Sequence, residues 1–258
     1  VSVFLFLLFT TKSGDEPKNK RMCVAMGFLS RLFNNFFDYS YPLFTVIMKF
    51  AVANFLWFFF NFPVFVIAMM LFFANSPDTR VLFIFSIVVL LPFLFFPATA
   101  ALFGIVRDWI LHREKRMYAS FWKYFRSNYK KSMTAGFLIT IVMGISIVDY
   151  YYFVERNLLL SYLFLIFIGW TFLFSLYYLS DIVHNDLSQK QHLKNSLLLI
   201  LSNPLVSIIV AVLCIGIVVI SVGYFTFFVP ICMGSLIAFV SFKGYYIVFS
   251  RVVELKEL

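Results

Sequence analysis

Residues Met133–Val183 read MTAGFLITIVMGISIVDYYYFV, then ERN, then LLLSYLFLIFIGWTFLFSLYYLSDIV. Each of the two long runs reaches the roughly 20 apolar residues that an α-helix needs to cross the hydrocarbon of a bilayer. Neither run shows the strict alternation of apolar and polar residues that is typical of a half-buried strand. Because only Glu155–Asn157 separates them, we expect two neighbouring, antiparallel membrane-spanning helices.

The composition of the whole chain agrees with this interpretation. Of the 258 residues, 62% are hydrophobic and 13% are charged, and the mean hydropathy is +0.93. Soluble domains usually have about 45–50% apolar and about 25% charged residues. The aromatic share of 21% suits contact with lipid and with the interfacial belts of a membrane. The composition therefore predicts an integral membrane protein and excludes a soluble enzyme.

Apolar runs of sufficient length occur six times, which predicts an all-α, polytopic membrane helical bundle. The expected spans are residues 44–73, 81–106, 133–154, 158–183, 204–222 and 224–249. The first span is longer than the bilayer requires, so we expect it to be tilted or kinked at Pro63. Pro92 and Pro97 predict a bend within the second span.

The amino-terminal 25 residues differ from the remainder of the chain. They begin with an apolar run that has no basic residue ahead of it and no small-residue cleavage site after it, which argues against a signal peptide. We expect residues 1–25 to be a poorly ordered extension or an over-long start assignment. Residues 26–258 are expected to form a single integral membrane domain.

Basic residues set the expected orientation. With the amino terminus inside, eighteen of the 21 Lys and Arg residues lie in the inner segments, whereas Arg80 and Arg156 lie outside. This asymmetry follows the positive-inside rule and predicts that both termini are cytoplasmic. It also explains the net charge of +9 without nucleic acid as a partner.

Three partly polar stretches precede the three expected helical hairpins, and the clearest is residues 117–132. On a helix, its aromatic residues Phe121, Trp122, Phe125 and Tyr129 share one face, and its basic residues Lys123, Arg126, Lys130 and Lys131 point away from that face. This pattern predicts a short cytoplasmic interfacial helix that lies against lipid. A docking surface for a cytoplasmic partner is the alternative.

Polar side chains within the spans are candidates for function. Asn54, Trp57 and Asn61 share one face of the first span, where they form interhelical hydrogen bonds or contact a substrate. Asp149 is an intramembrane carboxylate near the outer end of the third span. Asp181 lies near the inner end of the fourth span, where we expect solvent to reach it.

Other residue patterns argue against catalysis and metal binding. Cys23, Cys214 and Cys232 have no ligand-type spacing, and helical geometry does not bring His184 and His192 together. The chain contains no phosphate-binding loop, HExxH or GxSxG motif. We therefore expect neither an enzyme nor a cofactor.

Two groups of residues resemble a known family. PATAALF at Pro97–Phe103, followed by Arg107 and by FWKYFRSNYKK at Phe121–Lys131, is similar to the central signature of the YesL family of bacterial integral membrane proteins. NFLW at Asn54–Trp57 is similar to the first span of that family. Asp149 is similar to a carboxylate late in its third span. The resemblance covers approximately Met26–Glu254.

The spacing of these motifs departs from the family in one place. Family members have few residues between the first proline motif and the Pro-Ala-Thr motif, whereas Phe65–Phe96 are interposed here. The resemblance therefore leaves five or six spans open, while hydropathy favours six.

The resemblance implies a functional setting but no mechanism, because the family is a domain of unknown function. Its members are often encoded beside carbohydrate-uptake ABC transporters and glycan-degrading enzymes. We therefore expect a non-enzymatic accessory protein of the bacterial cytoplasmic membrane that contacts the lipid bilayer and subunits of a carbohydrate ABC transporter. The alternative is a solute transporter or channel in its own right.

Overall fold

The computed structural model describes residues 44–113 and 116–257, and no strand occurs in these ranges. Residues 49–258 form one compact unit, to which the architecture below refers. The expected extension at residues 1–25 lies outside the described residues. After helical residues 44–60, the elements are α3 (Phe62–Phe73), α4 (Pro77–Leu90), η1 (Leu91–Phe95), α5 (Phe96–Ile110), α6 (Met117–Val154), α7 (Leu158–His184), α8 (Gln189–Ser202), α9 (Pro204–Gly223), η2 (Val229–Met233) and α10 (Gly234–Glu257).

The lengths and compositions of the described helices are those of a multi-pass membrane protein. Five helical stretches are long and apolar enough to cross a bilayer. The number rises to six if helix 44–60 and α3 together make one span. The fold class expected from the sequence, an all-α polytopic membrane bundle, is thereby confirmed.

Helix 44–60 and α3 differ in direction by 71°. Pro63 lies in the first turn of α3 and cannot donate a backbone hydrogen bond, and its ring excludes a straight helix through this point. The interruption expected at Pro63 is therefore present. It divides the predicted span at residues 44–73 into two helices.

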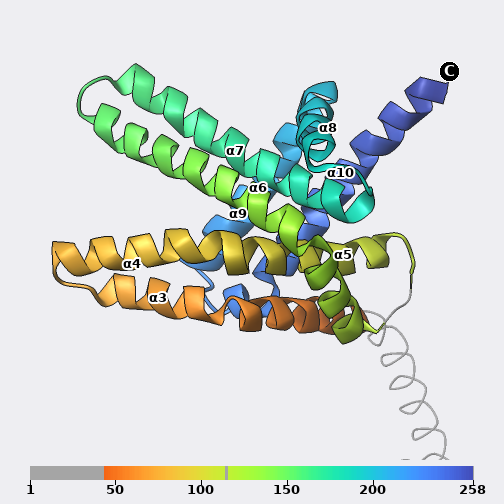
Figure 1. Ribbon diagram of the computed structural model, residues 1–258, viewed down its shortest axis with the longest axis horizontal. Coiled ribbons are helices and arrows are strands. Elements are labelled where there is room, and N and C mark those ends of the chain that lie inside the picture. The colour runs from red at the N-terminus through yellow and green to blue at the C-terminus, as the bar shows by residue number, and fades with distance from the viewer. Residues whose placement is uncertain (1–43, 114–115, 258) are drawn as a thin grey trace, which may run out of the picture. The chain divides into compact units, whose positions relative to one another are not determined.

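The chain then turns and returns through α4, η1 and α5 as one continuous helical stretch from Pro77 to Ile110. Ser76 caps α4, because its hydroxyl accepts a hydrogen bond from the amide of Thr79 at 3.3 Å. Pro92 lies in η1, a π-helical segment, where a wider turn accommodates the missing amide hydrogen. Figure 1 shows α3 and α4 side by side as a hairpin.

Helix α6 corrects one expectation. The predicted interfacial helix at residues 117–132 and the predicted span at residues 133–154 form a single helix of 38 residues. Residues 117–154 contain no proline, and the Ser132 hydroxyl donates to the Asn128 carbonyl at 2.8 Å without breaking the helix. At 1.5 Å per residue the helix is about 57 Å long, far more than the roughly 30 Å of hydrocarbon.

Helix α7 packs against α6 as the three-residue link requires, and the two lie side by side in Figure 1. Asn157 caps α7 by accepting bonds from the amides of Leu159 and Leu160. Helix α8 begins with a capping box between Ser188 and Gln191. The Ser-Asn-Pro sequence at its end separates α8 from α9, although Asn203 makes no capping bond.

The last predicted span begins later than expected. Residues 224–227 form a non-helical turn region, and the helix resumes at Phe228 and continues through the π-helical segment η2 into α10. Pro230 lies in the first turn of η2, where its missing amide hydrogen would have no acceptor within the helix, so a new helix can begin at this point. Each of the two π-helical segments, η1 and η2, thus contains a proline, Pro92 and Pro230 respectively.

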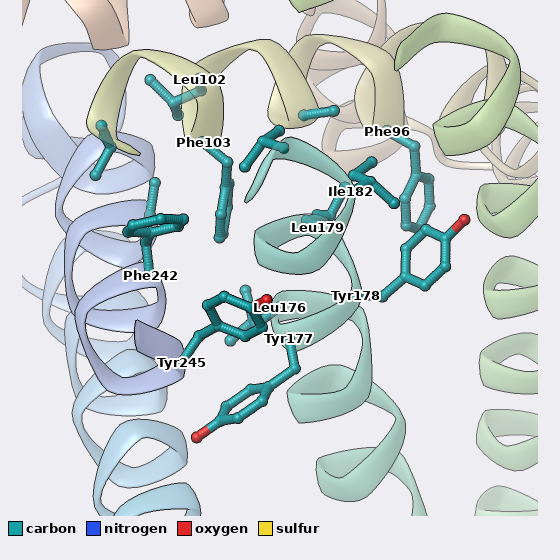
Figure 2. Close-up of a cluster of buried hydrophobic side chains, with 14 of the residues drawn as sticks. Phe96, Leu102, Phe103, Leu176, Tyr177, Tyr178, Leu179, Ile182, Phe242 and Tyr245 are labelled. Atoms are coloured by element: carbon teal, nitrogen blue, oxygen red, sulfur yellow. The ribbon is translucent and has the colours of Figure 1, made fainter. Parts of the chain in front are cut away.

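The core lies where α5 meets α6, α7 and α10. Every residue of α5 from Phe96 to Val106 is buried, and its small residues allow close packing. Figure 2 shows the rings of Phe103, Tyr177, Phe242 and Tyr245 converging from α5, α7 and α10. By contrast, the outward faces of α4, α6, α7 and α9 are rich in exposed Leu, Ile, Val and Phe, as contact with lipid requires.

Candidate functional site

The most highly connected polar residue among those described is Asp181, near the end of α7. Its Oδ1 accepts hydrogen bonds from Asn185 Nδ2, Asn195 Nδ2 and the Tyr245 hydroxyl, each at 2.7 Å. Its Oδ2 accepts a bond from His192 Nδ1 at 2.5 Å. Asn185 Nδ2 also donates to the Tyr245 hydroxyl at 3.0 Å. We call these five residues the Asp181 cluster.

The Asp181 cluster is sealed from solvent, which corrects the expectation that water reaches Asp181. Asp181, His192 and Tyr245 each have an exposed fraction of 0%. Helix α8 supplies His192 and Asn195 and covers the carboxylate, while α10 supplies Tyr245 from the other side. A buried carboxylate is tolerated only when its oxygens are hydrogen-bonded, and four donors meet that requirement here.

His192 lies against Asp181 with its second ring nitrogen enclosed. An Asp–His pair orients a general base in many hydrolases, but such a base also needs a nucleophile at its second nitrogen. His192 Nε2 is buried and has no hydrogen-bond partner among the described residues. The nearby Ser196 hydroxyl donates instead to the His192 carbonyl at 2.8 Å. The hydrogen bonds of the Asp181 cluster join α7, α8 and α10.

The two histidines that the sequence raised as a metal pair have separate surroundings. His192 contacts Asp181, whereas the His184 ring packs among aromatic rings of α10, including Phe249 at 4.9 Å between centroids. Within residues 44–113 and 116–257, no group of three or more His, Cys, Asp or Glu side chains could hold a metal ion.

Asn54 and Asn61, which the sequence placed on one face of the first span, have different surroundings. Asn54 makes two contacts to the segment that contains η2: its Nδ2 donates to the Val229 carbonyl at 2.9 Å, and its Oδ1 accepts from the Ser235 amide at 3.0 Å. Asn61 lies at the break between helix 44–60 and α3; its Nδ2 donates to the Trp57 carbonyl at 2.8 Å, and its buried Oδ1 has no partner among the described residues. Trp57 Nε1 donates to the Thr99 hydroxyl of α5 at 3.0 Å.

Asn54 therefore has the interhelical role that the sequence suggested, and Asn61 has a local one. Gly234 allows this arrangement, because a Cβ at position 234 would lie 3.0 Å from Asn54 Oδ1 and 3.1 Å from the Trp57 ring. Asp149 does not join either group. It is half-buried near the carboxyl end of α6, away from the Asp181 cluster.

The first half of α6 carries its aromatic and basic residues on different surfaces from those expected. Phe121 is 2% exposed and packs on Phe60 at 5.1 Å between ring centroids, so it faces the core and not a lipid headgroup. Trp122 is 50% exposed, stacks on Phe125 at 5.8 Å, and has the Arg126 guanidinium 5.7 Å from its ring. Helix 44–60 thus covers the inner side of this aromatic group.

The basic residues of the same half are mostly free at the surface. Lys123, Arg126 and Lys130 are exposed, whereas Lys131 Nζ donates to Asp186 Oδ1 at 3.0 Å. The Tyr178 hydroxyl donates to the Lys131 carbonyl at 3.1 Å and holds this point of α6 against α7. We call the exposed set of Trp122, Lys123, Arg126 and Lys130 the α6 basic surface.

A polar contact that the sequence did not indicate holds α6 against α5. The Tyr124 hydroxyl donates to Asp108 Oδ1 at 2.9 Å, and Arg107 Nη1 lies 3.4 Å from the same hydroxyl. Gly104 makes room for the ring, because a Cβ at position 104 would lie 2.4 Å from Tyr124 Cγ. The α6 basic surface is therefore anchored on its inner side by Phe121, Tyr124 and Lys131.

Sequence reasoning missed most of the Asp181 cluster. The spacing of Asp181 and Asn185 places them one helical turn apart, which is the one local signal of a pair. Asn195 and Tyr245 lie far along the chain and come to Asp181 only through the packing of α8 and α10. Their polar character is ordinary for residues near a membrane surface, so the pattern alone did not single them out.

These features together define a multi-pass helical membrane protein in which buried polar contacts fix the helices to one another. Residues 50–150 match the model of a family described as "Protein of unknown function, DUF624". The matched range includes Asn54, the Pro-Ala-Thr motif and the α6 basic surface, and it ends before the Asp181 cluster. No curated protein and no solved structure matches the chain.

Proposed function

We propose that this chain is a non-enzymatic accessory protein of the bacterial cytoplasmic membrane that binds a carbohydrate-uptake ABC transporter through the α6 basic surface. Both termini are cytoplasmic in this proposal, because that orientation places the α6 basic surface and most other basic residues inside. The resemblance to the YesL family supplies the carbohydrate setting. The residues that carry this resemblance lie within the range matched by the uncharacterised family.

The observation that carries the proposal is the continuity of α6. Helix α6 runs from Met117 to Val154 without a break, so its first half is a rigid extension of a membrane span. Phe121, Tyr124 and Lys131 fix that half from the inner side, while Trp122, Lys123 and Arg126 remain exposed. Because its side chains are already positioned, such a surface loses little conformational entropy when a protein binds. Tryptophan and arginine are also enriched in binding hot spots.

Co-purification tests this proposal. The triple variant Lys123→Gln/Arg126→Gln/Lys130→Gln and the unchanged protein are isolated from native membranes in a mild detergent, and the bound ABC transporter subunits are quantified by mass spectrometry. We expect the unchanged chain to retain those subunits and the triple variant to lose them, because the substitutions remove the charges without touching the inner contacts.

A matched control separates a specific surface from net charge. Lys190→Gln/Lys194→Gln/Arg251→Gln removes the same number of exposed charges from α8 and α10, and we expect it to retain the transporter. Equal recovery from the two triple variants, or absence of transporter subunits from the unchanged protein, would refute the proposal.

A solute transporter or channel is the second candidate, and the interrupted helices favour it. The break at Asn61 and the π-helical segments η1 and η2 all occur within apolar stretches. Discontinuous helices form the binding sites of many transporters. Uptake of a labelled sugar into vesicles that contain this chain alone would support this second function, whereas uptake only when the ABC transporter is present would favour the accessory role.

A further inference from the structure

A cavity of about 400 Å³ lies inside the bundle, at a point to which every apolar stretch except α8 contributes. Its wall includes Trp57, η1, α5, the middle of α6, α7 and η2. The volume lies in the usual range for small-molecule sites, about 300–1,000 Å³. The wall is almost entirely hydrocarbon and aromatic ring, and none of the described residues that line it is charged.

Three hydroxyl groups interrupt this apolar wall, and two of them are already paired. The Thr99 hydroxyl donates to the Phe95 carbonyl at 2.6 Å and accepts from Trp57 Nε1. The Ser175 hydroxyl donates to the Phe172 carbonyl at 2.6 Å. Such bonds to a carbonyl one turn earlier are the usual way in which hydroxyl groups are satisfied within membrane helices.

Thr140 is the exception. It is 8% exposed, and its Oγ1 is buried without a hydrogen-bond partner among the described residues. The other threonines within α5 and α6 and that of α7 do bond to backbone carbonyls, as Thr134 does to Lys130 and Thr171 to Phe167. A buried donor that is left unpaired is costly, so an acceptor from a bound molecule would satisfy it.

The cavity is also placed to receive a molecule from lipid. Val88 of α4 and Ile147 of α6 border it, and each is 41% exposed. Figure 1 shows α4 and α6 diverging away from η1, and the outward faces of both helices carry apolar residues. An apolar chain that enters between the two hairpins therefore leaves one hydrocarbon environment for another.

We propose that this cavity binds one acyl chain of a membrane lipid, with the Thr140 hydroxyl donating a hydrogen bond to the ester carbonyl. The apolar wall selects a hydrocarbon chain, and the single free donor selects an uncharged acceptor next to that chain. A carbohydrate does not fit the same wall, because its many hydroxyl groups would lack partners there. The proposal concerns a ligand site and holds whichever protein the α6 basic surface binds.

The test uses Trp57, which lies in the cavity wall, as the reporter. Trp109, Trp122 and Trp170 are replaced by Phe in the full chain, and the purified protein is titrated in detergent with a monoacylglycerol whose acyl chain carries two bromine atoms. We expect quenching of Trp57 fluorescence that saturates at one molecule per chain and that unbrominated monoacylglycerol reverses.

Two glycines provide a matched pair of variants. Gly144 lines the cavity, and Gly169 in α7 does not; at both positions an added Cβ meets nothing within 4 Å. We expect Gly144→Leu to fill the cavity and remove the saturable quenching, and Gly169→Leu to leave it unchanged. Quenching that never saturates, or that is equal in the two leucine variants, overturns the proposal.

A second pair of variants tests the hydrogen bond without changing the volume of the side chain much. Thr140→Val should weaken binding of the monoacylglycerol by roughly three- to tenfold, the usual effect of losing one hydrogen bond. Thr171→Val removes a hydroxyl that is already paired outside the cavity and should leave the affinity unchanged. Equal affinities of the Thr140→Val and Thr171→Val variants contradict the assigned role of Thr140, even if Gly144→Leu does not fold.

Discussion

Asp181 shows how one side chain can join three parts of the chain. Its two carboxylate oxygens accept bonds from Asn185, from His192 and Asn195 of α8, and from Tyr245 of α10. Replacing it by asparagine turns one acceptor oxygen into a donor that faces donors already present. We expect Asp181→Asn to lower the free energy of unfolding by about 3–5 kcal/mol, as when one partner of a buried pair is removed.

Thermal and urea unfolding in detergent measure this loss. Asp149→Asn is the matched control, because Asp149 is half-buried near the carboxyl end of α6 and makes no side-chain hydrogen bond or ion pair with the other described helices. We expect that control to change stability by less than about 1 kcal/mol. A drop for Asp149→Asn that equals the drop for Asp181→Asn would contradict the structural role of the cluster.

Asn54 and Asn61 also differ in what they hold. Asn54→Leu removes two bonds to the chain near η2 and should cost about 0.6–2 kcal/mol. Asn61→Leu removes one bond, to the Trp57 carbonyl one turn earlier, together with an unpaired oxygen. We therefore expect a smaller loss of stability or none. The free energies of unfolding of the two single variants, measured in parallel, test this order. A larger loss for Asn61→Leu would contradict it.

The sequence supported the role of Asn54 and gave the wrong environment for Asp181, and both outcomes have physical reasons. An amide in the middle of an apolar span must find a partner, whichever helix provides it. A carboxylate near the end of a span can be solvated or covered, and the outcome depends on how the next helix packs. Helix α8 covers Asp181 here, and no local pattern in residues 189–202 shows on which side α8 lies.

At the scale of elements, α5 can pack closely against α6 because Gly104 has no side chain where the Tyr124 ring lies. Gly104→Ala places a Cβ 2.4 Å from Tyr124 Cγ, so the ring must move away from Asp108. We expect this variant to be destabilised by about 1–3 kcal/mol, the usual cost of overpacking. Gly144→Ala adds a Cβ in open space and should be neutral or stabilising by up to about 1 kcal/mol.

Melting temperatures of the two alanine variants provide the comparison, since both lie in helices and both lose the same backbone freedom. If Gly104→Ala and Gly144→Ala melt together, the packing of Tyr124 on α5 does not contribute to stability. A stabilised Gly104→Ala variant would have the same meaning.

The helices themselves illustrate what periodicity can and cannot predict. Apolar length located the α6–α7 hairpin and its three-residue link. Apolar length also placed a boundary between residues 117–132 and residues 133–154, and that boundary was wrong. The sequence becomes less polar at that point, but the helix continues through it. The prolines at positions 63 and 92 predict irregularity, but the form it takes, a 71° break or a π-helical segment, depends on the packing around each one. The π-helical segment at Pro230 was not predicted.

At the scale of the whole molecule, the expected orientation leads to a labelling experiment. Cysteines introduced at Ser76 and Asn157, at the tips of the α3–α4 and α6–α7 hairpins, should react with an impermeant thiol reagent added to intact cells. A cysteine at Ser127, on the exposed side of the first half of α6, should react only after the cells are opened. Labelling at Ser127 in intact cells would contradict the proposed topology.

The global fold was the most predictable level, because lipid allows few ways to satisfy a backbone. The presence of several membrane helices follows from apolar length, whereas their number stays at five or six. The central cavity does not, because it depends on how helix 44–60, η1, α6 and η2 meet, and these segments are distant in sequence.

The segments η1 and η2 have a consequence for how the chain can change in length. A π-helical turn contains one residue more than an α-helical turn needs. Deleting a residue from an ordinary span rotates everything beyond it by about 100° and turns its core-facing surface away from the core. A deletion within residues 91–95 or 229–233 instead converts the wide turn to an α-turn and leaves the later register intact. Sequences related to this one should therefore tolerate single-residue gaps inside these two spans, at positions where gaps are otherwise confined to loops.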